Sequence, residues 1–193
     1  MNPVDYALLA KRAYTDAPTV GNPGSASRMH VYGDVHCFRG TDGVMSDMAD
    51  AKVLTTNVWG IGSVHSGFYA ALAAILPACL ALPRPKAIAG HSLGAAMAIL
   101  YAAVLAQLGS IVPVFAFEPP RLCADGGLEA LLQDKQVPFF ATRNGCDLVT
   151  QVPPGMTLPG PLTLIGKATV PFDNIADHGI DRVIAALAGG RHV

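Results

Sequence analysis

The chain has 193 residues, of which 51% are hydrophobic and 14% are charged, and its formal net charge is −1. This length is most simply a single domain over residues 1–193, with enough apolar side chains for a substantial core. A charge close to zero, without a long basic run, gives no electrostatic footprint of nucleic-acid binding, so no nucleic-acid partner is expected.

Hydrophobic periodicity and turn residues predict the elements in chain order. The first half begins with a helix over 4–14, followed by strands over 30–38 and 51–55 and by a helix over 66–82 that is broken or kinked near Pro77. The second half is expected to alternate: a strand over 86–90, a helix from Leu93 to about Leu108, a strand over 112–117, a helix over 127–134, a strand over 137–143, an edge strand over 162–166 and a helix over 179–188. The central alternation of strands and helices predicts an α/β fold, with a mostly parallel sheet and helices on both faces.

Two segments bear on the compartment. Residues 1–18 lack the pattern of a signal peptide, because Asp5 interrupts their only apolar run and no basic region precedes it. The compartment is therefore unknown, with the cytoplasm as the default. Residues 85–117 are almost free of charge, but the helical part, about 93–108, is shorter than the roughly 20 residues of a membrane span. We expect a buried helix and no transmembrane segment.

A glycine-flanked serine, Gly90-His91-Ser92-Leu93-Gly94, joins a short apolar run to a long helix-forming run. This is the strand–turn–helix setting of a nucleophile elbow, in which the serine has a strained backbone and small neighbours let strand and helix pack closely. The alternative is a glycine turn with a serine that merely caps the helix.

A serine hydroxyl needs a base to become a good nucleophile. In this chain order the base is a histidine after the serine, and His178 is a better candidate than the penultimate His192. Asp147 follows the predicted strand 137–143, which places it at the same sheet edge as Ser92. The alternative for Asp147 is a purely structural role as an Asx-turn residue after Asn-Gly. Four other aspartates compete as the acid: Asp125, Asp134, Asp173 and Asp177.

Several motifs together resemble the class 3 lipase family of α/β-hydrolases. They are "CFRGTD" (37–42), "VHSGFYAAL" (64–72), the lipase box "GHSLGAAMA" (90–98), "FEPPR" (117–121), with Glu118 where glycine is usual, and "RNGCDLVTQVPP" (143–154). The resemblance implies an α/β-hydrolase fold with Ser92 as nucleophile, Asp147 as acid and His178 as base. It also implies an oxyanion hole formed at Thr41 and by the Leu93 backbone N–H.

The segment between 41 and 64, where family members carry a lid, is short enough for only a minimal one. Apolar residues near the acid, the base or this segment are expected to line a substrate site: Met45, Met48, Leu148, Val149, Phe172 and Ile175. The expected substrate is a small-molecule ester or lipid, with a possible transient contact to a lipid interface.

The sequence therefore predicts a serine carboxylester hydrolase, a lipase or esterase that works through an acyl-enzyme intermediate. It needs no metal or cofactor, and the four cysteines fit no metal-binding pattern, so free and mostly buried thiols are expected. Two alternatives stay open: acyl transfer to an acceptor other than water on the same triad, and a hydrolase-fold interaction module without turnover.

Overall fold

The computed structural model describes residues 1–41 and 54–190. Within them a seven-stranded sheet runs in the order β1-β2-β3-β6-β7-β8-β9, and β4 pairs with β5 in a separate hairpin. The first two pairings of the main sheet are antiparallel and the other four are parallel. The strands are β1 (Val20–Gly21), β2 (Arg28–Tyr32), β3 (Val35–Phe38), β4 (Thr55–Val58), β5 (Gly62–His65), β6 (Ala87–His91), β7 (Val114–Phe117), β8 (Phe139–Asn144) and β9 (Thr163–Ile165).

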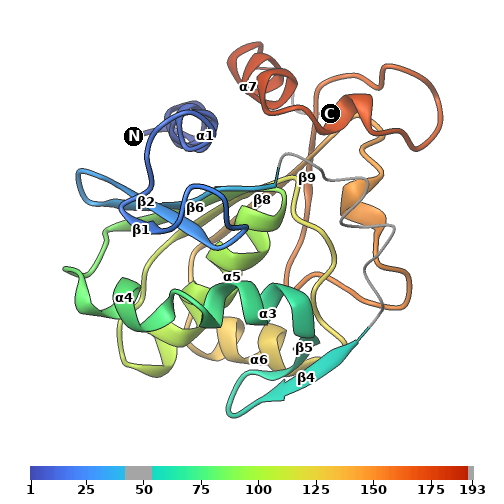
Figure 1. Cartoon of the computed structure of the whole chain (residues 1–193). Coiled ribbons are helices and arrows are strands. Elements are labelled where there is room, and N and C mark those ends of the chain that lie inside the picture. The colour runs from blue at the N-terminus through green and yellow to red at the C-terminus, as the bar shows by residue number, and fades with distance from the viewer. Residues whose placement is uncertain (42–53, 191–193) are drawn as a thin grey trace.

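Helices cover both faces of the main sheet, with α1 and α7 on one face and α3 to α6 on the other (Figure 1). The helices are α1 (Pro3–Arg12), α3 (Ser66–Ala73), α4 (Leu76–Ala81), α5 (Leu93–Gln107), α6 (Gly127–Asp134) and α7 (Ile180–Ala188), with short 3-10 turns η1 (Val149–Gln151) and η2 (Ala176–His178). The prediction of an α/β fold, with a mostly parallel sheet between helical layers, is confirmed.

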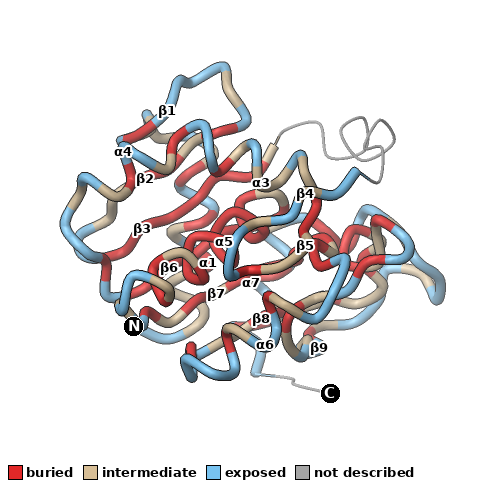
Figure 2. Tube along the Cα trace, turned by 90° about the horizontal axis from the view of Figure 1, so that it is seen from below, coloured by how far each residue is buried: buried red, intermediate tan, exposed pale blue. Residues whose placement is uncertain are grey.

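The centre of the molecule is the strand β6 and the helix α5 that follows it. Every residue of β6 is buried, as is nearly every residue of α5 (Figure 2). An apolar sequence on all sides of α5 is explained by this position, because neighbouring helices and the sheet cover it all round. Over the described residues, no helix has both the length and the hydropathy that crossing a bilayer requires.

One predicted strand is wrong. Residues 30–38 were expected to form a single strand, but the chain turns at Gly33 and Asp34 and returns as an antiparallel hairpin. Gly33 has φ of +63°, a left-handed conformation that glycine adopts without steric cost. The alternating pattern continued through the turn, so periodicity alone did not mark it.

The other predicted elements agree with the structure to within a few residues, including the break in 66–82, whereas β1 and β5 were not predicted. There α3 ends at Ala73, and Pro77 lies in the first turn of α4, where a missing N–H is tolerated. The predicted strand 51–55 lies mostly outside the described residues, since β4 begins at Thr55. All four cysteines are free; Cys146 is half-buried and the other three are buried.

Candidate active site

Ser92 stands between β6 and α5 with φ of 59° and ψ of −128°, which is a strained conformation for a residue with a side chain. It occupies the N-cap position of α5, but its side chain makes no capping hydrogen bond. The capping alternative therefore does not describe what the hydroxyl does. A buried serine whose hydroxyl does not cap the helix is available for chemistry.

A serine and two acidic side chains follow neighbouring parallel strands. Ser92 follows β6, Glu118 follows β7 and Asp147 lies three residues beyond β8. Because the carboxyl ends of parallel strands meet at one edge of the sheet, this order brings the three residues to the same edge.

The Asp147 carboxylate binds the imidazole of His178, which the chain supplies 31 residues later. Its Oδ2 atom lies 2.9 Å from Nδ1 of His178, and Oδ1 accepts the N–H of Val149 at 2.9 Å. The turn role and the role as partner of the base thus coexist in one carboxylate. Burial alone would raise the pKa of Asp147, but hydrogen bonds from His178 and Glu118 hold that pKa below its usual range.

The hydrogen bond to Asp147 also fixes the ring of His178. With Nδ1–H donated to the carboxylate, Nε2 carries the free lone pair, and this buried atom has no hydrogen-bond partner within the described residues. A neutral imidazole held in this tautomer can accept a proton at Nε2, which is the function of a general base.

The four competing aspartates have other partners. Asp125 accepts the N–H groups of Ser63 and Gly127, while Asp134 and Asp173 form ion pairs at the surface with Lys135 and Arg143. The Asp177 carboxylate, next to His178 in sequence, accepts hydrogen bonds from Cys146, Thr169 and Asn174.

The loop that carries His178 is organised around the Asp177 carboxylate, a network that sequence reasoning missed. The carboxylate accepts the N–H of Cys146 at 2.9 Å, the N–H and hydroxyl of Thr169, and the side-chain amide of Asn174 at 3.0 Å. These contacts join the segment after β8 to the segment before α7, so they fix the place of His178 relative to Asp147.

A second support for His178 comes from His91, the residue before the serine. The Nε2–H of His91 donates to the His178 carbonyl oxygen at 2.8 Å, and Nδ1 accepts the hydroxyl of Tyr14 at 2.7 Å. Burial, and after it the neighbouring His178, lower the pKa of His91 to about 3. His91 is therefore a neutral ring that positions the base segment.

The proposed oxyanion residues border the serine turn. A Cβ on Gly40 would lie 3.2 Å from Cβ of Ser92 and 2.7 Å from the His91 carbonyl oxygen, so the backbone before Thr41 is packed against the nucleophile turn. Leu93 is the first residue of α5, and the N–H of a first-turn residue has no partner within its helix.

The residues predicted to line the substrate site are not alike in burial. Val149 is buried and Leu148 is half-buried beside the acid, whereas Phe172 and Ile175 are 65% and 38% exposed near the base. Met45, Met48 and His192 lie outside the described residues.

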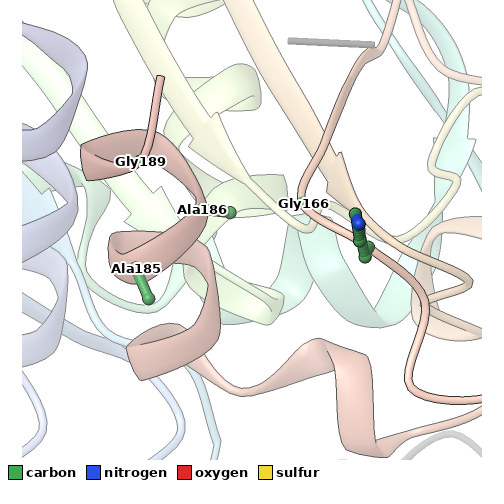
Figure 3. A pocket seen from close by; sticks show the side chains of 5 residues that line it. Gly166, Ala185, Ala186 and Gly189 are labelled. Carbon is green, nitrogen blue, oxygen red and sulfur yellow. The ribbon is translucent and has the colours of Figure 1, made fainter. Parts of the chain in front are cut away.

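Two further features have the form of a ligand site. Among the described residues, donor atoms of Glu118, Asp147 and His178 lie within 4.8 Å of one another, a spacing at which three groups could share an ion. A separate hollow of about 290 Å³ lies between the end of β9 and α7 and is lined by Gly166, Lys167, Ala185, Ala186 and Gly189 (Figure 3). Its walls carry one charged side chain and no nucleophile, so it does not compete with the cluster at the sheet edge.

Comparisons with known proteins agree with the motifs. The sequence model of the family "Lipase (class 3)" matches residues 35–156. The structure is similar to a lipase from Rhizopus microsporus var. chinensis, with 20% identity, TM-score 0.71, and coverage of 91% of this chain and 84% of that one. It is also similar to a Rhizomucor miehei lipase propeptide complex, with 21% identity, TM-score 0.68, and coverage of 91% and 76%.

A third similar structure is described as a triacylglycerol lipase whose catalytic centre is a serine protease triad, with 18% identity, TM-score 0.62 and coverage of 91% of each chain. No curated protein matches the chain in sequence. The family match spans the strand that ends before Thr41, the serine turn and the acid. The chain therefore belongs to the class 3 lipase family and is a carboxylic ester hydrolase.

Proposed function

We propose that the chain hydrolyses carboxylic esters through a covalent acyl-serine intermediate on Ser92. One observation carries the proposal: Asp147 holds His178 through Nδ1 at 2.9 Å, leaving the buried Nε2 without a partner at the sheet edge where Ser92 has a strained backbone. A triad requires this combination of an oriented base and a nucleophile turn at the same edge.

In the first half of the reaction, Nε2 of His178 takes the Ser92 hydroxyl proton as Oγ attacks the ester carbonyl carbon. The tetrahedral oxyanion is stabilised at Thr41 and by the Leu93 N–H, and each such donor contributes about 3–4 kcal/mol in the transition state. His178 then protonates the leaving alcohol as the acyl-enzyme forms. In the second half, water attacks the acyl group, His178 accepts its proton, and the acid is released as Ser92 regains a proton.

Asp147 acts on the base rather than on the substrate. Its carboxylate keeps the Nδ1–H tautomer in place and offsets the positive charge that His178 gains when it accepts the serine proton. The substrate is an ester of a small molecule or a lipid, and the exposed Phe172 and Ile175 are suited to a transient contact with a lipid surface.

The test replaces the nucleophile. We expect Ser92→Ala to fold normally, to lose about 10⁶-fold in kcat on a soluble chromogenic ester and to lose labelling by a fluorophosphonate probe. The matched control is Ser66→Ala, a serine at the start of another helix, α3, which should keep both signals. Retention of most ester hydrolysis by Ser92→Ala would contradict the proposal.

A further inference from the structure

Glu118 is an unusual residue in three respects. It follows β7 with φ of +53°, a left-handed conformation that costs a residue with a side chain about 1 kcal/mol or more. Its side chain is completely buried. Among the ion pairs of the described residues, none joins it to a lysine or an arginine. A residue with a strained backbone and a buried acid that has no cationic partner, placed close to Asp147 and His178, calls for a functional explanation.

The contacts of Glu118 point its carboxyl group at Asp147. Oε1 accepts the Thr142 hydroxyl at 3.2 Å, and the N–H of Asn144 lies 3.0 Å from both oxygens. On the other side, an oxygen of Glu118, an oxygen of Asp147 and a ring nitrogen of His178 lie within 4.8 Å of one another. The two donors thus hold the carboxyl group in place, and its remaining side faces the acid of the proposed triad.

Two carboxylates this close and this buried cannot both be ionised without a large electrostatic cost. Burial raises the pKa of Glu118 well above its usual range, and the hydrogen bond and negative charge of Asp147 raise it further, whereas Asp147 is held ionised by His178. This geometry favours a single proton shared by the pair, held on Glu118 rather than on Asp147.

We propose that Glu118 is a positioning residue that acts through Asp147, donating its carboxyl O–H to the Asp147 carboxylate and so fixing the acid that orients His178. The proposal rests on the triad assigned above. The Asp147 carboxylate then accepts three hydrogen bonds, from Val149 N–H, His178 Nδ1–H and the Glu118 O–H. No bond is made or broken in this role, and Glu118 keeps its proton throughout.

This arrangement has a consequence for the pH dependence of the reaction. Among the described residues, His178 binds Asp147 directly, and His91, whose ring centroid lies 4.7 Å from that of His178, interacts electrostatically with Asp147. A neutral donor on Asp147 withdraws part of its negative charge from His178. Without the donor, the full negative charge of Asp147 faces the proposed base, so we expect a variant that lacks the donor to show the acid limb of its kcat/KM profile at higher pH than the wild type.

The experiment compares two substitutions. Glu118→Gln keeps a neutral N–H donor and an acceptor, whereas Glu118→Gly removes the donor and relieves the backbone strain. We expect Glu118→Gly to lose about tenfold in kcat and to shift the acid limb of the kcat/KM profile to higher pH. Its thermal stability should fall, because the Thr142 hydroxyl and the Asn144 N–H lose their acceptor and the relief of backbone strain offsets only part of that loss. Glu118→Gln should recover most of the lost kcat and the wild-type limb. The control is Gln136→Gly, an exposed residue with φ of 52°, which relieves the same strain far from the site and should leave the profile unchanged.

A double-mutant cycle tests whether Glu118 acts through Asp147. In an Asp147→Asn background, Glu118→Gly should change the residual kcat by less than about twofold, because the carboxylate that it supports is gone. A full tenfold loss in that background would overturn the proposal, as would an unshifted pH limb in Glu118→Gly.

A readout that needs no activity separates this proposal from the proposed function. In infrared spectra at neutral pH, the wild-type protein should retain the carbonyl band of a protonated carboxylic acid, and Glu118→Gln should lack it. The band can be present even if Ser92→Ala shows that ester hydrolysis does not use the triad. Its absence from the wild type would overturn the proposal, as would stoichiometric binding of added Zn²⁺ that Glu118→Gln abolishes, because an ion would then replace the shared proton.

Discussion

At the scale of single residues, backbone strain marks the site. Among the described residues, the non-glycine residues with positive φ are Ser92, Glu118 and Gln136. Two of the three lie at the sheet edge where Asp147 binds His178, and the third is in the exposed turn after α6. Strained conformations persist when surrounding structure enforces them, which is the condition of a preorganised reactive site.

The pH dependence of stability is expected to include a contribution from Asp177. Burial alone would raise the pKa of its carboxyl group, but hydrogen bonds from Thr169, Cys146 and Asn174 lower it. A lowered pKa in the folded state stabilises the protein at pH values above the ordinary aspartate value of about 3.9, and this stabilisation is lost as the pH falls through the lowered value. We expect Asp177→Asn to reduce the free energy of unfolding by about 1–3 kcal/mol at neutral pH.

The measurement is chemical denaturation of the wild type and Asp177→Asn between pH 7 and pH 3. The difference between them should shrink toward acid, where the wild-type carboxylate is protonated too. Asp134→Asn removes a surface carboxylate whose side chain is 71% exposed, and it should change stability little at any pH. If the difference in the free energy of unfolding between the wild type and Asp177→Asn stayed constant with pH, the shape of the side chain and not its charge would stabilise the loop.

Sequence reasoning reached the residues of the site unevenly. Chain order and strand ends predicted that Asp147 and His178 pair, and their hydrogen bond is present; their roles in catalysis stay predictions. Glu118 was visible only as a departure from the expected glycine. The Asp177 network could not be foreseen, because its partners approach only when the segments after β8 and before α7 fold together.

At the scale of elements, the backbones of β6 and α5 approach each other closely at Gly90, which has no side chain to keep them apart. A Cβ on Gly90 would fall well inside contact distance of the Gly94 carbonyl oxygen and 2.8 Å from the N–H nitrogen of Ala95. Because these are backbone atoms of a buried helix, they cannot move aside cheaply. Gly90 thus lets β6 and α5 approach closely enough to form the sharp turn, while Gly94 lets α5 pack against the backbone of Phe38 and Arg39 at the end of β3.

We therefore expect Gly90→Ala to destabilise the protein by about 3 kcal/mol or more and to abolish ester hydrolysis, because the added methyl group separates β6 from α5. Thermal and chemical unfolding measure the first effect. Gly126→Ala is the matched control: φ is −83° and nothing lies within 4 Å of an added Cβ, so stability should change by only a few tenths of a kcal/mol. If Gly90→Ala were equally mild, the close packing of the turn would not be required.

Elements were predicted well where one physical signal dominated. The run from Leu93 is apolar and rich in alanine, and α6 has apolar residues at helical spacing, so both helices were placed within one residue of their observed ends. The hairpin at 28–38 was missed because the alternating pattern was followed through the turn, although the pair Gly33-Asp34 is a signal for a two-residue hairpin loop.

At the scale of the whole molecule, the sheet separates two cores of unequal size. The larger lies against α3 to α6, and the smaller is formed by α1, α7 and the facing side chains of the strands. Helix α1 begins the described chain and α7 ends it, and the two pack against each other (Figure 1). Since His178 immediately precedes α7, the docking of the two terminal helices places the base over the sheet edge.

The acyl chain of the substrate is expected to contact the segment that precedes the base. Phe172 and Ile175 are apolar, 65% and 38% exposed, and lie within six residues of His178, so they contribute little to the core but are available to a substrate. We expect Phe172→Ala and Ile175→Ala to shift the preferred chain length in an ester series from acetate to palmitate. For each substrate methylene that no longer packs against the enzyme, the activation free energy derived from kcat/KM should rise by about 1–3 kcal/mol. Their thermal stability should remain close to that of the wild type. Ile111→Ala removes an equally exposed apolar side chain, 46% accessible, ahead of β7 at the opposite edge of the sheet, and should leave the profile unchanged. An unaltered preference in both substrate-side variants would place the acyl site elsewhere, with the stretch from Trp59 to Phe68 as the next segment to substitute.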